Sequence, residues 1–298
     1  MATPSASLIT QASSIPNTQD AAHDAARPKR LDRGIIVGLL LAASAFLTGL
    51  SFTGIKFTYF FNPAAAVLVI GGTLAVLVIT TPLHGLRRAL NRVLELASLP
   101  DLDREQLSEE IIHYAKIVRQ EGLLAIEPEI KNAHSAFFRD ALLMALDVKT
   151  RAELLAALET ELRLIERLGE TDAKVIEVAG GFVPTIGIIG TVIGLIDVMH
   201  HFSDLGSVGS GIGTAFVSTI YGLVLANLVL LPIAHRMRSR VAATFEIQEL
   251  IIEGVLCLYD ELHPTLVRLR LAAFLRSPKS NLERYDVLAE TPLWEARP

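Results

Sequence analysis

The chain has 298 residues, of which 51% are hydrophobic and only 20% are charged, and its mean hydropathy is +0.44. This balance is too apolar for an ordinary soluble domain, and the charges gather in blocks, as in a protein that alternates between membrane and aqueous segments. The net charge of −5 comes without a basic stripe, which excludes nucleic-acid binding, and the single cysteine excludes an intrachain disulfide.

The N-terminal segment 1–33 is rich in Ala, Ser, Thr, Asp and Pro and has little periodicity, so we expect a disordered leader. It contains two aspartates and no apolar core, which is unlike a signal peptide. Two apolar runs follow, at 34–55 and 63–82, and each is long enough to cross the hydrocarbon core of a bilayer. Asn62 and Pro63 form a turn followed by a helix start.

Two further spans are predicted at 178–199 and 211–234, inside a stretch of about sixty residues without Lys or Arg. The stretch holds three acidic residues, and none of them lies near the midpoint of either span. If these helices line an ion path, another chain must therefore bring the acid that carries the ion. The three acids are Glu177, Asp197 and Asp204.

Basic residues predict the orientation of the spans. Arginines and a lysine precede the first span, and arginines follow the second and the fourth, whereas the opposite loops hold only Lys56. Because basic residues stay in the cytoplasm, four spans with both termini in the cytoplasm are expected. The loop 83–177 and the tail 235–276 are then cytoplasmic, and 277–298 is expected to be a flexible C-terminus.

The cytoplasmic loop is predicted to be helical. Apolar residues recur at helical spacing in 104–119, 137–146 and 151–177. No proline separates the last segment from the third span, so the two are expected to form one long rod, and 242–261 extends the fourth span in the same way. The predicted fold is thus an all-α membrane protein with four transmembrane helices, a helical cytoplasmic loop between spans two and three, and long cytoplasmic extensions.

The third span carries a stripe of small residues. Pro184, Gly187, Thr191 and Gly194 follow one another at steps of three, four and three, so they share one helix face. Small residues let helix backbones approach closely in lipid, and tight helix packing explains the glycines. Within a helix, Pro184 also frees a backbone carbonyl, which could contact a cation or water beside the hydroxyl of Thr191.

The fourth span repeats this pattern. Ser218, Thr219 and Gly222 lie on a second small and weakly polar stripe, with Tyr221 beside it and Pro232 near the cytoplasmic end. A hydroxyl in a membrane helix often bonds only to its own backbone. Two facing stripes with hydroxyls at similar heights nevertheless favour a narrow polar path between the spans, with the first two spans outside it. The sequence holds no Walker loop, dinucleotide fingerprint, metal-binding pair or nucleophile elbow, so we expect neither an enzyme nor a cofactor or metal site.

Several motifs, taken in order, resemble a known family. Gly181-Phe-Val-Pro184-Thr-Ile-Gly187-x-x-Gly190-Thr191-Val-Ile-Gly194 and Ala215-Phe-Val-Ser218-Thr219-Ile-Tyr221-Gly222 are similar to the MotA/TolQ/ExbB ion-channel superfamily. The stretches 62–73, 119–127 and 253–275 narrow the resemblance to MotA/PomA, the A subunit of the bacterial flagellar stator. The resemblance covers about residues 32–276.

This resemblance implies a function. In stators, several A subunits form a ring in the bacterial inner membrane around the helices of a MotB/PomB-like B-subunit dimer, and the B helix carries the aspartate that binds the permeating ion. By resemblance, Pro184 and Pro232 are the two prolines of the mechanism. Arg119 and Glu127 match the charged positions that engage the rotor switch protein, whereas without the resemblance they read as solvated surface charges.

The coupling ion is predicted to be H⁺ or Na⁺. The hydroxyls of Thr191, Ser218 and Thr219 favour Na⁺, whereas Asn62 stands where some sodium-type relatives have Asp. Three alternative functions stay open. One is an ExbB/TolQ-type energiser, against which two predicted spans before the cytoplasmic loop argue. The others are a MotA-like motor subunit that powers another process, and a self-sufficient channel that conducts ions without a partner.

Overall fold

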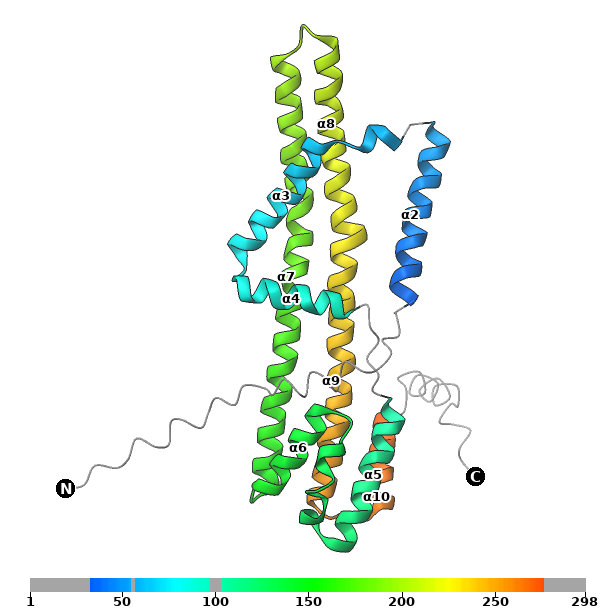
Figure 1. Ribbon diagram of the computed structural model, residues 1–298, viewed down its shortest axis with the longest axis vertical. Helices are drawn as coiled ribbons and strands as arrows, with labels where there is room; N and C mark the ends of the chain where they lie inside the picture. The colour runs from blue at the N-terminus through cyan, green and yellow to red at the C-terminus, as the bar shows by residue number, and fades with distance from the viewer. Residues whose placement is uncertain (1–32, 55–56, 97–102, 276–298) are drawn as a thin grey trace, which may run out of the picture.

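Two long helical rods dominate the molecule (Figure 1). The computed structural model describes residues 33–54, 57–96 and 103–275, and in these ranges all regular structure is helical. One rod is α7 (Arg151–His200); the other joins α8 (Leu205–Val224), η4 (Leu225–Leu230) and α9 (Leu231–Tyr259). The predicted all-α fold is confirmed for the described part of the chain.

The rod α7 is one helix of 50 residues. At 1.5 Å per residue it is roughly 75 Å long, more than twice the roughly 30 Å hydrocarbon core of a bilayer. Its start is capped by Thr150, whose hydroxyl accepts a hydrogen bond from the Glu153 N–H. The continuous rod that was predicted from 151 through the third span is therefore confirmed.

The second rod begins earlier than the predicted 211. Asp204 caps α8 by accepting from the Gly206 N–H, so the glycine-rich stretch that follows is helical rather than a loop. Within η4 the helix widens, and the Leu231 N–H bonds to the Ala226 carbonyl, five residues back. Pro232 follows in the first turn of α9, where a proline is tolerated. The extension of the fourth span to about 261 is confirmed as far as Tyr259.

Three further helices lie beside the rods, between the α7–α8 end and the helical domain described below. They are α2 (Arg33–Thr53), α3 (Pro63–Thr80) and α4 (Leu83–Glu95), with the short η1 (Phe57–Phe60) between the first two. In Figure 1, α3 lies obliquely against the rods, α4 crosses them, and α2 stands apart. The second span ends two residues before the predicted 82, because the residue before Pro82 is held in an extended conformation. The separate helix α4 was not predicted.

By length and composition, three helices in the described part of the chain can cross a membrane: α3 and the two rods. The predicted first span, 34–55, overlaps α2, a helix of 21 residues that ends at Thr53 and is not one of these three. The predicted leader and the flexible C-terminus lie outside the described residues, apart from Arg33.

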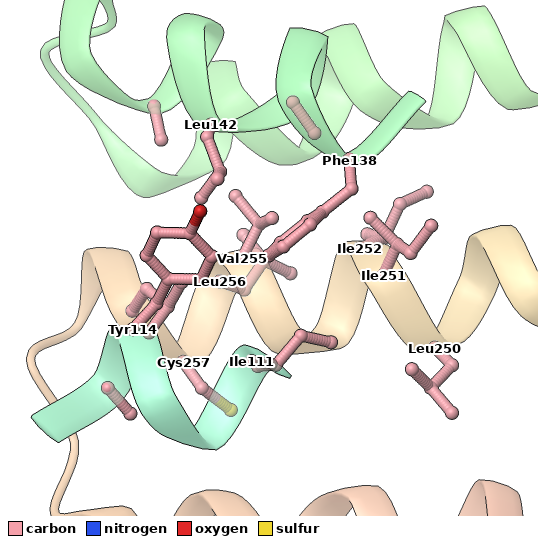
Figure 2. Close-up of a cluster of buried hydrophobic side chains, with 14 of the residues drawn as sticks. Ile111, Tyr114, Phe138, Leu142, Leu250, Ile251, Ile252, Val255, Leu256 and Cys257 are labelled. Carbon is pink, nitrogen blue, oxygen red and sulfur yellow. The ribbon is translucent and has the colours of Figure 1, made fainter. Parts of the chain in front are cut away.

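A helical domain surrounds the end of the rods that lies farthest from the apolar spans (Figure 1), and Figure 2 shows buried side chains of its core. It consists of α5 (Arg104–Glu121), η2 (Leu123–Ile126), η3 (Ile130–Asn132), α6 (Ala136–Asp147) and α10 (Pro264–Leu275), packed on α7 and α9. Ile111, Phe138 and Val255 are fully buried in its core, and Tyr114 meets Phe138 edge to face, with ring centroids 5.6 Å apart. The helices predicted at 104–119 and 137–146 are confirmed within two residues.

Candidate functional site: the seam between the rods

The contact between α7 and α8 is formed by the two stripes of small residues, and we call this contact the seam. A methyl group added to Gly194 would lie 2.7 Å from the Ala215 nitrogen and 2.7 Å from the Gly211 carbonyl oxygen. A methyl group on Gly222 would lie 3.1 Å from the Val183 carbonyl oxygen. These backbones are therefore close enough that only glycine fits, and the predicted tight helix packing is confirmed.

The hydroxyl groups of the seam meet as expected. Thr191 Oγ1 is hydrogen-bonded to Thr219 Oγ1, and it lies 3.2 Å from the Gly187 and Ala215 carbonyl oxygens. Ser218 is fully buried and donates to the Thr214 carbonyl oxygen at 2.8 Å. Each of these three hydroxyls thus bonds to a backbone carbonyl, and the threonine pair also joins the two rods.

Pro184 lies half-buried in α7 where both rods interrupt their regular hydrogen bonding. Its missing N–H takes away the usual helical donor of the Gly180 carbonyl. A methyl group on Gly180 would lie 2.9 Å from Leu231 of the other rod, directly after the widened turn of η4. Such wide turns often occur at functional sites. Pro232 is exposed there and lies outside the seam.

Tyr221 joins the seam helix α8 to the start of α3. Its hydroxyl donates to the Phe60 carbonyl oxygen, while the Asn62 amide Nδ2 donates to Thr214 Oγ1 at 2.9 Å. The Asn62 side chain also caps α3 by accepting from the Ala65 N–H at 3.1 Å. The structure therefore places the Tyr221 hydroxyl at the corner before α3, away from the threonine pair.

Beyond the apolar part of the rods, ion pairs join α7 to α9. Arg238 reaches Glu177 with an Nη1–Oε1 distance of 2.9 Å, and its Nε lies 3.4 Å from Glu170. The hydrogen bond from Arg238 lowers the pKa of Glu177. From the sequence, Glu177 could be placed only as an acid away from the span midpoints. Its partner lies 61 residues away and could be identified only from the packing of the rods.

Arg119 and Glu127 lie far from the seam, in the helical domain. Both are exposed, Arg119 near the end of α5 and Glu127 directly after η2. The two are separated by Gly122, which ends α5 with φ +85°. The guanidinium of Arg119 donates to the Glu261 carbonyl oxygen at 3.4 Å, a contact with the turn between α9 and α10.

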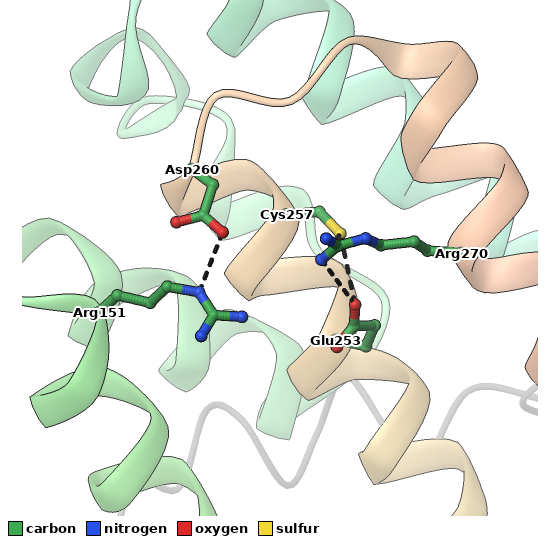
Figure 3. Close-up of polar contacts among 5 residues, drawn as sticks. All are labelled: Arg151, Glu253, Cys257, Asp260 and Arg270. Carbon is green, nitrogen blue, oxygen red and sulfur yellow. Dashed lines mark hydrogen bonds and ion pairs between the residues drawn. The ribbon is translucent and has the colours of Figure 1, made fainter.

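That turn is fixed by two charged contacts (Figure 3). Arg151 at the start of α7 binds Asp260 at the end of α9 at 3.0 Å, and Arg270 of α10 binds Glu253 of α9 at 3.0 Å. Cys257 is buried beside the second pair, and burial raises the pKa of its thiol. The helical domain therefore holds Arg119 on a rigid base.

Apolar side chains cover the outward faces of both rods at the height of the seam. In the described part of the chain, no cluster of three or more His, Cys, Asp or Glu could hold a metal ion. The exposed large side chains at this height include Ile188, Ile189, Val192, Ile193, Phe216 and Leu223. Such a surface is suited to lipid or to another apolar helix.

Comparison with known proteins gives one consistent picture. Residues 129–249 match the family model described as the MotA/TolQ/ExbB proton channel family. Motility protein A of Bacillus subtilis (strain 168) is 30% identical over 247 residues, which cover 82% of this chain and 91% of that protein. Chemotaxis protein PomA of Vibrio alginolyticus is 26% identical over 254 residues, with 85% and 99% covered.

Solved structures agree with these relatives. The flagellar MotAB stator complex from Bacillus subtilis contains a chain with a TM-score of 0.77 and 28% identity, covering 85% of this chain and 99% of that one. A chain in the structure of C. jejuni MotAB has a TM-score of 0.78 and 21% identity, covering 83% and 97%, and it supports the fold.

Proposed function

The chain belongs to the MotA/TolQ/ExbB family as a MotA-type stator A subunit, and from this premise we propose how its rods convert ion flow into rotation. It is a protein of the inner membrane that works with a B subunit, because the matching solved structures are MotAB complexes, in which an A chain is joined by a B chain. Its rods supply hydroxyl-bearing helices with a proline inside α7 and a wide turn at η4, and the B subunit supplies the aspartate that binds the ion.

One observation carries this division of labour. The third span has no acidic residue between Glu177 and Asp197, and the second rod has none between Asp204 and Glu246. A charged side chain at the centre of a bilayer costs about 3 kcal/mol on insertion scales, so ion binding that neutralises a B-subunit aspartate changes its preferred contacts substantially. This change drives each step of the rods around the B helix.

The A subunits form a ring in this proposal. The outward faces of α7 and α8 carry exposed isoleucines and Phe216, which no helix covers in the described part of this single chain. Neighbouring copies and the B helix cover these faces. The proposed topology has four spans, with α2 as the first, and both termini in the cytoplasm.

Arg119 and Glu127 contact the rotor switch protein. Both are exposed on the helical domain, which is held at the end of two rods that reach into the membrane. Complementary charges at such an exposed contact give orientation and specificity more than binding strength. The continuous helices α7 and α9 pass a movement of the spans to this surface.

The path for H⁺ or Na⁺ runs beside Pro184 and Pro232, between the seam and the B helix. Pro184, Gly187, Thr191, Gly194, Ser218, Thr219, Tyr221, Gly222 and Pro232 are the residues proposed to shape it. Swimming measured in K⁺ medium at constant pH separates the two ions, because a sodium-driven motor stops there and a proton-driven one does not.

The proposal is tested by co-purification of the chain with a B subunit of the same organism, followed by imaging of the complex and complementation of a stator-deleted strain. We expect several copies of this chain around two B subunits and restored swimming. A chain that purifies without the B subunit and restores no motility would refute it.

A further inference from the structure

A fully buried carboxylate lies outside the seam. Asp172, on α7, has no exposed side-chain surface. Two arginines of α4 surround it: Arg88 Nε lies 2.7 Å from Oδ1 and 3.0 Å from Oδ2, and Arg92 Nε lies 2.8 Å from Oδ2. We call these three residues the Asp172 clamp. A buried charge is retained only where it is paired and hydrogen-bonded, and this one is bound by both arginines.

The surrounding residues are shaped to receive the clamp. The helix α4 packs against α7, and its small residues Gly85 and Ala89 are buried. On α7, a methyl group at Gly169 would lie 3.2 Å from the Arg92 guanidinium and 2.6 Å from Val241 of α9. Gly169 and Asp172 are three residues apart on one helix face, so together they form the place where the arginine of α4 lies.

The helix α4 is in turn suited to a membrane surface. It follows the apolar helix α3 directly and crosses the rods in Figure 1. The side chains of Leu83, Leu90 and Leu94 are exposed on the face opposite the clamp. An amphipathic helix with this arrangement lies in the plane of the headgroups. The clamp therefore connects α7 to an element that the membrane itself holds in place.

Along the rod α7, the Asp172 clamp lies between the seam and the helical domain. Asp172 precedes Pro184 by twelve residues, or roughly 18 Å along the helix. The seam and Pro184 lie on one side of it, and the helical domain with Arg119 lies on the other. Arg238 ties α7 to α9 nearby through Glu170 and Glu177. Any movement of the spans must therefore pass this level before it reaches the helical domain.

We propose that Asp172 is a positioning residue of the motor: by binding Arg88 and Arg92, it fixes the rod α7 on the membrane-surface helix α4. A displacement of α7 in the membrane then moves the helical domain, because the rod cannot tilt at its exit from the bilayer. This inference rests on the proposed stator function. It assigns no ion binding to Asp172, whose carboxylate is already occupied by the two arginines.

The test uses the whole stator complex in a stator-deleted strain. Under high load, the rotation speed of a bead attached to a flagellum rises in steps as stator units join the motor. The step size therefore reports the torque per unit, and the number of steps reports assembly. For Asp172→Asn, which keeps the shape and removes the charge, we expect the wild-type number of steps, the wild-type membrane level, and a step size below half of the wild-type value.

The matched control is Glu159→Gln on the same helix. Glu159 and Arg163 form a surface pair at 3.4 Å, with 45% and 66% of their side chains exposed, so the loss of this pair should leave the step size unchanged.

A wild-type step size in Asp172→Asn would overturn the inference. If Asp172→Asn does not accumulate, Arg88→Lys is measured instead, because lysine keeps the positive charge and loses the planar guanidinium. A reduced step size at normal assembly in Arg88→Lys supports the inference, and an unchanged step size overturns it. Absence of steps for the wild-type chain would instead refute the proposed stator function.

Discussion

The seam predicts a sharp difference between two glycines of the same helix. Replacing Gly194 by alanine puts a methyl group 2.7 Å from two backbone atoms of α8, whereas a methyl group at Gly181 meets no atom within 4 Å. Ordinary contacts begin near 3.4 Å, so the Gly194→Ala rods must separate by several tenths of an ångström. Backbone atoms cannot rotate away as a side-chain end can, and overpacking of this kind costs about 1–3 kcal/mol.

Gly181→Ala is the matched control. Both substitutions gain the same preference of alanine over glycine in a helix, about 1 kcal/mol, so their difference isolates the clash in the seam. For a chain of this size, that difference lowers the midpoint of thermal unfolding by roughly 2–5 °C. The midpoints are compared for the detergent-purified stator complexes, with Gly213→Ala on α8 as a second control. Equal midpoints for Gly194→Ala and Gly181→Ala would refute the close contact of the rods.

Three further outcomes are expected. Reversing the charge of Arg119 or Glu127 should reduce stall torque while the complex still assembles, with partial recovery when the opposing rotor charge is also reversed; full torque in both variants would contradict a rotor contact. Pro184→Ala should stop swimming but leave membrane insertion intact, which is checked by motility assays and fractionation, and normal swimming would remove Pro184 from the mechanism. Burial raises the pKa of Tyr114 to about 12. Because a tyrosine in the unfolded chain ionises near pH 10, the stability of the complex should fall as the pH rises from 10 towards 12. Tyr114→Phe should weaken this loss of stability, and identical pH profiles for the two proteins would contradict the prediction.

The long rods could be predicted because their determinants are local. Apolar residues recur at helical spacing from 151 onwards, and no proline interrupts the helix before Pro184. The prediction of α8 was too short because its glycines resemble a loop. In the structure these glycines lie in a helix that starts at the Asp204 cap, and two of them, Gly211 and Gly222, pack against α7.

The charged contacts could not be predicted, since they depend on packing between distant segments. Asp172 stands in a charged stretch of α7 and looks like any surface acid; only the approach of α4 buries it. In the sequence, Arg88 and Arg92 are basic residues that follow a span and indicate its orientation, and their common partner lies about eighty residues away. The helix α4 was not predicted, although its four leucines recur at helical steps of three, four and four residues from Leu83 to Leu94.

The central claim is that this chain shapes the ion path but carries no ion-binding acid within it. Purified chain is reconstituted into liposomes alone and together with its B subunit, and ion entry is followed after a membrane potential is imposed. The account predicts that liposomes with the chain alone stay as tight as empty ones, and that an activated complex with the B subunit conducts. Substantial flux through the chain alone would contradict it.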